Sequence, residues 1–191
     1  MKIHISIGHL PQINFYKNLV HNLHQKGHKV DFSVIDKGKN LVVFKKEYPL
    51  SKYFIGAKYR ENKFALVLLT GFIRLFKLIY KTFRNRYNVL ISTGFFTGLV
   101  AKIFNKKSIF INDDPEQNFQ FWLGLKFSDK IFVPKGSTSS KKNVHQFNGL
   151  KEWGYLSPKY FKPNIEVLDK YNLEPYNYLF FREINNSSLN Y

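Results

Sequence analysis

The stretch Lys2–Phe15, KIHISIGHLPQINF, contains the change of pattern that decides the fold. Its first part, Lys2–Ile7, has isoleucine at alternate positions and predicts a short β-strand. Gly8 ends this strand, and Pro11 holds the residue before it in an extended or turn conformation. From Asn14 onward the apolar residues recur at every fourth position, which predicts an amphipathic helix with Asn14 as its N-cap.

A second strand follows this helix closely. The apolar stripe of the helix is Phe15, Leu19 and Leu23, and Gly27 is a typical C-terminal stop. The alternating segment Val30–Val34 comes directly afterwards. Strand, helix and strand in this order form a βαβ unit, and such a crossover joins parallel strands. The beginning of the chain therefore predicts a parallel sheet.

The remaining segments continue the alternation of strands and helices. Strands are predicted near Tyr53–Ala57 and at Asn88–Ser92, Ser108–Ile111, Lys130–Val133 and Asn143–Phe147, and helices at Lys63–Arg86, Phe95–Phe104 and Gln117–Lys126. The rest of Asp36–Tyr59 has turn signals and no clear period, so we expect it to be irregular. The predicted fold is α/β: a Rossmann-like parallel sheet of six or seven strands with helices on both faces.

The character of the sequence changes beyond the last of these strands. Residues 1–150 carry the predicted sheet, and residues 151–176 form a connector with one or two helical turns at Glu166–Tyr171. Tyr178–Phe181, YLFF, predicts a new buried strand that has no partner nearby in the sequence. We therefore expect an N-terminal domain, a linker and, at residues 177–191, the truncated start of a second domain.

The composition excludes several chemistries. There are no cysteines among the 191 residues, which rules out disulfides, thiolate nucleophiles and zinc–thiolate sites and is typical of a reducing cytoplasm. His4 and the pair Gly8-His9 interrupt any apolar leader, so we expect no secretory signal. The net charge of +17 attracts nucleic acid, anionic lipid headgroups or phosphorylated substrates. A chain rich in Lys, Asn, Ile and Phe can also acquire this charge through compositional drift.

The predicted helix Lys63–Arg86 carries cations at helical spacing, namely Arg74, Lys77, Lys81 and Arg84. Its uncharged run Phe64–Ile73 is about half of the ~20 residues that a transmembrane span requires, so we expect no span. Two interpretations of the basic face stay open. It lies on an anionic membrane surface, or it is the solvated face of a helix that covers the sheet.

Polar residues follow three of the predicted strands. The first strand is followed by Gly8, His9, Gln12 and Asn14, the fourth by Ser92, Thr93 and Gly94, and the fifth by Asn112, Asp113, Asp114 and Glu116. Because ligands of open parallel sheets bind beyond the carboxyl ends of the strands, we expect these residues to line one cleft. Gly8 permits close approach of the backbone, and the helix beginning near Asn14 offers N–H groups to an anion.

Catalytic candidates are few. His9 is either a general base or a hydrogen-bonding turn residue. Three interpretations stay open for the acids Asp113, Asp114 and Glu116. They take part in acid–base chemistry, they bind a divalent cation, or they only favour the start of the next helix. The sequence has no G-x-G-x-x-G fingerprint, P-loop or G-x-S-x-G elbow, which argues against classical NAD or ATP binding and against serine acyl chemistry. The histidines do not form a metal motif, so we expect neither a metal nor a cofactor.

Several short motifs carry a family resemblance. They are Gly8-His9-x-Pro11-x-x-x-Phe15 with Lys17, Lys26-Gly27-His28-Lys29-Val30, Ser92-Thr93-Gly94, Asn112-Asp113-Asp114-x-Glu116, Phe127-Ser128-Asp129-Lys130-Ile131, and Phe181-Arg182-Glu183. Together they resemble the domain-of-unknown-function 354 family. That family is a relative of glycosyltransferase-B (GT-B) enzymes and is similar to nucleotide-sugar 2-epimerases and lipid-linked N-acetylglucosaminyltransferases.

The resemblance implies two Rossmann-like domains with an active site between them. The N-terminal domain would supply the acceptor site and the acid–base residues, with His9, Asp113, Asp114 and Glu116 as the catalytic candidates. Most of the nucleotide-sugar donor, for example a UDP-sugar, would bind the C-terminal domain, which opens at Arg182 and Glu183. On this resemblance the sequence ends where that domain would begin, so we expect the chain alone to be inactive.

Three functions follow as expectations. The first is the N-terminal half of a GT-B-type enzyme that acts on a nucleotide-activated sugar in cell-surface polysaccharide or glycolipid synthesis. The second is a nucleotide-sugar 2-epimerase, and the third is a non-catalytic module that needs a partner donor-binding domain. We expect a cytoplasmic protein, located at the inner face of the membrane if the acceptor is lipid-linked. Nucleic-acid binding is not expected, because no known recognition module is present.

Overall fold

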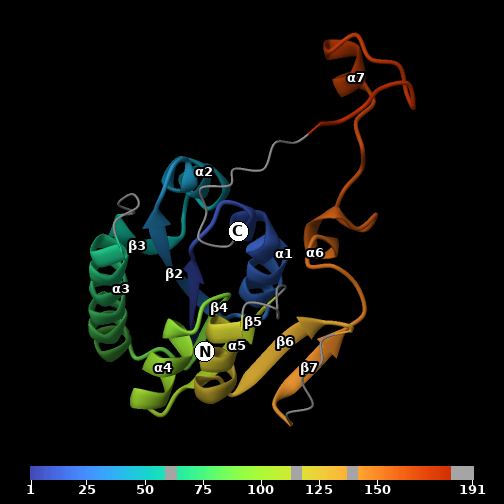
Figure 1. Cartoon of the computed structure of the whole chain (residues 1–191). Helices are drawn as coiled ribbons and strands as arrows, with labels where there is room; N and C mark the ends of the chain where they lie inside the picture. Colours follow the sequence, from blue (N-terminus) through green and yellow to red (C-terminus); the bar gives the residue numbers. More distant parts are fainter. Residues whose placement is uncertain (59–63, 113–117, 137–141, 182–191) are drawn as a thin grey trace. The chain divides into compact units, whose positions relative to one another are not determined.

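The computed structural model of the chain describes residues 1–58, 64–112, 118–136 and 142–181 (Figure 1). The chain divides into two compact units, Met1–Tyr155 and Leu156–Tyr191. The first unit contains the sheet.

The first unit contains a seven-stranded sheet in which every neighbouring pair of strands is parallel. The strands are β1 (Lys2–Ile7), β2 (Lys29–Asp36), β3 (Lys52–Lys58), β4 (Val89–Ser92), β5 (Lys107–Ile111), β6 (Lys130–Pro134) and β7 (Val144–Phe147). Their order is β3-β2-β1-β4-β5-β6-β7, so the order reverses between β1 and β4. This is the Rossmann arrangement, and the predicted fold class is confirmed.

Helices cover both faces of this sheet. The helices of the chain are α1 (Pro11–Gln25), α2 (Asn40–Glu47), α3 (Phe64–Asn85), α4 (Phe96–Ile103), α5 (Asn118–Phe127), α6 (Trp153–Leu156) and α7 (Glu166–Lys170). One core cluster joins α1 and α2 to one face of the sheet, and two further clusters lie beneath α3, α4 and α5 on the other face. The alternation of β1 divides its residues between these faces, with Ile5 turned to α1 and His4 to α3.

Helix α1 begins earlier and faces differently than the sequence predicts. It starts at Pro11, with Leu10 as its N-cap, so the predicted N-cap at Asn14 is wrong. A proline suits this first helical position because its missing N–H has no helical partner there. The fully covered side chains of α1 are Ile13, Tyr16 and Val20, whereas Leu19 of the predicted stripe is 36% exposed. Phe15 and Leu23 lie at the border of the core.

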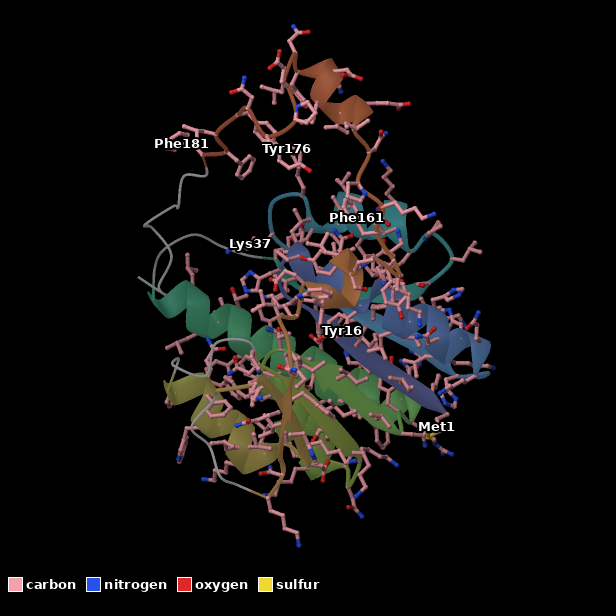
Figure 2. The ribbon with its side chains drawn as sticks, turned by 90° about the vertical axis from the view of Figure 1, so that its right-hand side faces the viewer. Met1, Tyr16, Lys37, Phe161, Tyr176 and Phe181 are labelled. Atoms are coloured by element: carbon pink, nitrogen blue, oxygen red, sulfur yellow. The ribbon has the colours of Figure 1, made fainter. Side chains whose placement is uncertain are left out.

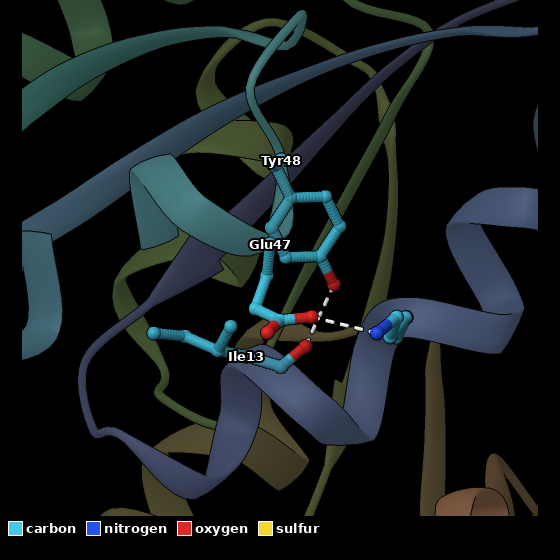
Figure 3. Close-up of polar contacts among 4 residues, drawn as sticks. Ile13, Glu47 and Tyr48 are labelled. Atoms are coloured by element: carbon cyan, nitrogen blue, oxygen red, sulfur yellow. Dashed lines mark hydrogen bonds and ion pairs between the residues drawn. The ribbon is translucent and has the colours of Figure 1, made fainter. Parts of the chain in front are cut away.

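Helix α2 falls within the segment predicted to be irregular, and this prediction is wrong. Only Asn40 and Phe44 of its eight residues are buried, so its amphipathic pattern is too short to identify a helix. Two contacts with α1 fix its C-terminal end (Figure 3). The Tyr48 hydroxyl donates a 2.7 Å hydrogen bond to the carbonyl of Ile13, and Lys17 Nζ lies 2.6 Å from Glu47 Oε2.

The second unit contains α7 and no strand among its described residues. The strand predicted at Tyr178–Phe181 is wrong, because no other strand in the described chain pairs with this segment. Its side chains are open to solvent, as at Phe181, which is 88% exposed (Figure 2). Across the described residues of the whole chain, no helix is long and apolar enough to cross a membrane.

Candidate functional site

The candidate site lies where the strand order reverses, beyond the carboxyl ends of β1 and β4. Gly8 and His9 follow β1, and Thr93 and Gly94 follow β4. Ligands of open parallel sheets typically bind in the crevice at such a reversal. The predicted residues after β1 and β4 therefore lie at the edge of the sheet where this fold commonly binds ligands.

The side chain of Gln12 forms hydrogen bonds with three other predicted site residues. The Gln12 Oε1 atom accepts hydrogen bonds from the backbone N–H of Gly8 at 2.7 Å and of His9 at 3.3 Å. Its Nε2 atom donates to the Thr93 hydroxyl at 2.5 Å. The backbone N–H groups at this turn are thus already paired within the protein. Asn14 lies one turn into α1 and is exposed, so it does not provide the helix N-terminus that the sequence suggested.

Asn40 is a residue of this edge that sequence reasoning missed. It is buried, and its Nδ2 donates to the carbonyls of Gly8 and Ile35, both at 3.1 Å. These bonds tie the end of β2 to the loop after β1. The available signal was its position, because Asn40 opens the helix that follows the turn at Gly38.

Ser92 closes the turn after β4. Its hydroxyl is fully buried and contacts the carbonyl of Gly94 and the hydroxyl of Thr97, and it accepts a 3.1 Å hydrogen bond from the Gly94 N–H. Thr97 Oγ1 also donates to the Gly94 carbonyl at 3.2 Å. The Ser92 hydroxyl is therefore used to shape the loop that carries Thr93 and Gly94.

Arg74 of α3 extends to this edge of the sheet from the face that α3 covers. Its Nη2 donates to Ser6 Oγ on β1 at 2.9 Å, and its Cζ lies 5.5 Å from the centre of the Phe96 ring. A Cβ added to Gly94 would lie 3.9 Å from Nη2, so the guanidinium is beside the turn after β4. The prediction that Arg74 belongs to an exposed basic face is wrong on either interpretation, because Arg74 is partly buried against Ser6 and Phe96.

The charge of Arg74 has no ion-pair partner among the described residues. No carboxylate among the described residues lies within 4.0 Å of the guanidinium. Burial lowers its pKa to about 10, which still leaves it protonated at neutral pH. A guanidinium has five N–H donors, and the Ser6 hydroxyl accepts from one of them. A phosphate group matches the remaining donors in charge and geometry.

A buried polar chain holds Ser6 in place. His4 Nε2 lies 3.0 Å from Ser33 Oγ, and Ser33 Oγ donates to Ser6 Oγ at 3.0 Å. Because Ser33 uses its proton toward Ser6, its oxygen accepts from the N–H at Nε2 of His4. Burial first, and then the charge of Arg74, lower the pKa of His4 to about 3. His4 is therefore neutral, and Arg74 is the only charged member of the hydrogen-bonded series that runs from His4 through Ser33 and Ser6.

The other cations of α3 do not form the common basic face that their spacing suggests. Lys77 Nζ donates to the carbonyl of Ile55 at 3.0 Å, and Lys81 Nζ lies 5.6 Å from the centre of the Phe54 ring, so both reach back over β3. Arg84 Nη1 donates to the Tyr80 hydroxyl at 3.1 Å on the exposed side.

The remaining predicted site residues lie outside the described part of the chain. These are Asp113, Asp114, Glu116, Arg182 and Glu183. The described residues contain no group of three or more His, Cys, Asp or Glu side chains that could hold a metal ion. The acid–base assignments for His9 and the three acids stay predictions.

Solved structures with the same fold support this description of the sheet. A UDP-N-acetylglucosamine 2-epimerase matches with a TM-score of 0.64 at 12% identity, over 89% of this chain and 54% of its own. MnaA of S. aureus, solved with UDP, matches with a TM-score of 0.58 at 17% identity, over 90% and 50%. The lipopolysaccharide outer core galactosyltransferase WaaB matches with 0.56 at 11% identity, over 76% and 44%.

These similarities show the fold, which is that of the N-terminal Rossmann-like domain in GT-B glycosyltransferases and UDP-N-acetylglucosamine 2-epimerases. This chain spans about half the length of the proteins it matches. No protein-family model and no curated protein sequence matches it. Membership of the domain-of-unknown-function 354 family therefore stays a prediction.

Proposed function

We propose that this chain is the N-terminal half of a GT-B-type enzyme that acts on a nucleotide-activated sugar in the synthesis of cell-surface polysaccharide or glycolipid. The Arg74 guanidinium, protonated and without a described carboxylate partner beside the β1/β4 crevice, is the observation that carries the proposal. The diphosphate of a UDP-sugar is an anion of the size and charge that such a site favours. The fold neighbours include a complex with UDP and a galactosyltransferase.

The proposed roles divide along the carboxyl edge of the sheet. Arg74 pairs with a phosphate oxygen, and Gly8 and Gly94 allow the backbone to approach the ligand closely. Gln12, Thr93 and Ser92 hold the two loops in position through their hydrogen bonds. His9 or one of the three acids that follow β5 in the sequence acts as the general acid or base. A donor-binding domain, in the same protein or in a partner, would complete the cleft in the cytoplasm.

Binding of UDP and of UDP-N-acetylglucosamine to the 191-residue chain tests the phosphate role. We expect Arg74→Met, which keeps most of the side-chain volume, to weaken binding about 10- to 100-fold, because a charge-assisted hydrogen bond is worth ~1.5–3 kcal/mol. Arg84→Met is the matched control, since Arg84 lies on the same helix and is exposed. Equal affinity of the two variants would contradict the phosphate role of Arg74, and the same comparison applies to the chain joined to a donor-binding domain.

A 2-epimerase is the second candidate, and one of the fold neighbours with a TM-score of 0.64 is such an enzyme. The two activities differ in what they need. An epimerase converts UDP-N-acetylglucosamine alone, whereas a transferase requires an acceptor. Incubating the chain, joined to a donor-binding domain, with that nucleotide sugar and no acceptor therefore separates them. In the same preparation, unchanged activity of both His9→Ala and Asp114→Asn would count against the proposed acid–base residues.

A further inference from the structure

Helix α3 presents an apolar stripe to the outside of the molecule. The stripe consists of Leu68, Leu69, Phe72, Ile73, Phe76, Tyr80 and Phe83, whose side chains are 39% to 71% exposed. At 100° per residue these positions fall within a single arc of about 140°. The cations of the predicted basic face lie on one flank of this arc or on the side of α3 turned to the sheet. The exposed face of α3 is therefore the apolar one.

The stripe continues onto the neighbouring helix. The rings of Phe83 and Phe104 lie 6.4 Å apart, which joins the end of α3 to the end of α4. Ile103 beside it is also exposed. An apolar surface of this extent, with three exposed phenylalanines in one helix, marks an interaction surface rather than ordinary scatter.

The described residues of the helices that carry and adjoin the stripe have charges of a single sign. Residues 64–112 and 118–128, which contain α3, α4 and α5, include nine basic residues and no acidic one. The nine are Arg74, Lys77, Lys81, Arg84, Arg86, Lys102, Lys106, Lys107 and Lys126. The nearest acids in the sequence are Glu61 and those at 113–117, all outside the described part, and Asp129, which accepts from the backbone and hydroxyl of Ser108.

The apolar stripe and the cations beside it together indicate which kind of partner covers this surface. A second copy of the chain would bring one face whose described residues are cationic against another such face, which costs electrostatic energy. Nucleic acid would satisfy the cations and leave the phenylalanines without an apolar environment. A bilayer that contains anionic lipid offers both: acyl chains for the stripe, and headgroups for the flanking Lys77 and Arg84.

We propose that the α3 stripe docks onto the surface of a bilayer that contains anionic lipid. The helix lies in the plane of the interface, since no described helix is able to span the membrane. Phe72, Phe76 and Phe83 enter the headgroup region, and the flanking cations contact lipid phosphates. This proposal rests on the surface of α3 and not on the nucleotide site.

Co-sedimentation of the 191-residue chain with vesicles tests the proposal. The vesicles contain one part phosphatidylglycerol to three parts phosphatidylcholine, and a second set contains phosphatidylcholine alone. We expect binding to the anionic vesicles and weaker binding to the neutral ones. The double variant Phe76→Ser/Phe83→Ser should bind the anionic vesicles roughly tenfold less or worse. Val42→Ser/Leu50→Ser is the matched control, because both residues are exposed apolar positions elsewhere in the unit.

Each outcome decides the proposal. All four substitutions are at exposed positions, so we expect both double variants to unfold at the temperature of the unaltered chain. No binding of the unaltered chain to anionic vesicles overturns the proposal. So does equal binding by the two double variants, because the +17 charge alone would then account for it. A dimer in solution that dissociates in Phe76→Ser/Phe83→Ser, without vesicle binding, would identify a second copy as the occupant instead.

Discussion

The Gln12 side-chain amide joins the start of α1 to Thr93 in the loop after β4, with Nε2 and Oγ1 2.5 Å apart. Because the same amide accepts from the N–H groups of Gly8 and His9, it couples the loops on both sides of the β1/β4 reversal. We therefore expect the stabilities of the two loops to be coupled through this side chain.

A double-mutant cycle measures this coupling. We expect Gln12→Ala and Thr93→Val each to lower the free energy of unfolding, and the double variant to lose about 0.5–1.5 kcal/mol less than the sum. Gln12→Ala should be the more costly single change, since it also leaves two backbone donors without their partner. Urea unfolding gives all four values. Gln25→Ala, at the exposed end of α1, serves as control and should change stability by less than about 0.5 kcal/mol.

The strands and the shared edge of the site could be predicted from the sequence, because both follow from local patterns. Isoleucine alternation in Lys2–Ile7 identifies β1, and parallel strands necessarily bring their carboxyl ends to one edge. The meeting of Gln12 with Thr93 follows from this rule. The role of Asn40 could not be predicted, because it depends on the carbonyl of Gly8 in the loop after β1 and on that of Ile35 in β2, which only the fold brings together.

The orientation of α3 could not be predicted for a related reason. Helical spacing shows that Arg74, Lys77 and Lys81 are close to one another, but it does not show which side of the helix meets the sheet. That choice depends on partners remote in sequence, here the Ser6 hydroxyl and the Phe96 ring. The family resemblance does not supply this information either, because it rests on loop motifs and not on α3.

The buried imidazole of His4 predicts an acid-sensitive fold. Its pKa falls from the usual 6.5 to about 3 in the folded chain, so protonation favours the unfolded chain. The free energy of unfolding should therefore decrease as the pH falls from about 6.5 towards 3, with no contribution from His4 above that range. Between pH 7 and pH 5 we expect a loss of about 2 kcal/mol from this group.

Urea unfolding at several pH values tests the role of His4. His4→Gln keeps an N–H donor near the position of Nε2 and removes the titration. Its stability should depend much less on pH between 7 and 5 than that of the unaltered chain. An unchanged pH dependence in this variant would assign the acid sensitivity to other groups.

The hydroxyl of Tyr48 predicts a measurable contribution to the packing of α2 on α1. Tyr48→Phe removes the donor to the Ile13 carbonyl and leaves that buried acceptor with one bond fewer, at a cost of about 1–2 kcal/mol. Tyr53→Phe makes the same chemical change at a partly exposed position on β3 and should be nearly neutral. Thermal unfolding compares the two, and equal stability of the variants would show that this hydrogen bond adds nothing net.

The contact between α5 and β5 depends on a glycine. A Cβ added to Gly124 would lie only 2.6 Å from Cδ1 of Phe110, whose ring is buried in the core beneath α5. Gly124→Ala therefore forces the ring or the helix to move, and we expect it to destabilise the chain by about 1–3 kcal/mol. Gly71→Ala in α3 makes the same substitution where the nearest atom, Phe96 Cζ, is 3.4 Å away. That variant should be neutral or more stable by up to about 1 kcal/mol, because alanine favours a helix interior. Urea unfolding of both variants gives the sign of each change. A Gly124→Ala variant as stable as Gly71→Ala would mean that α5 does not pack closely against the Phe110 ring.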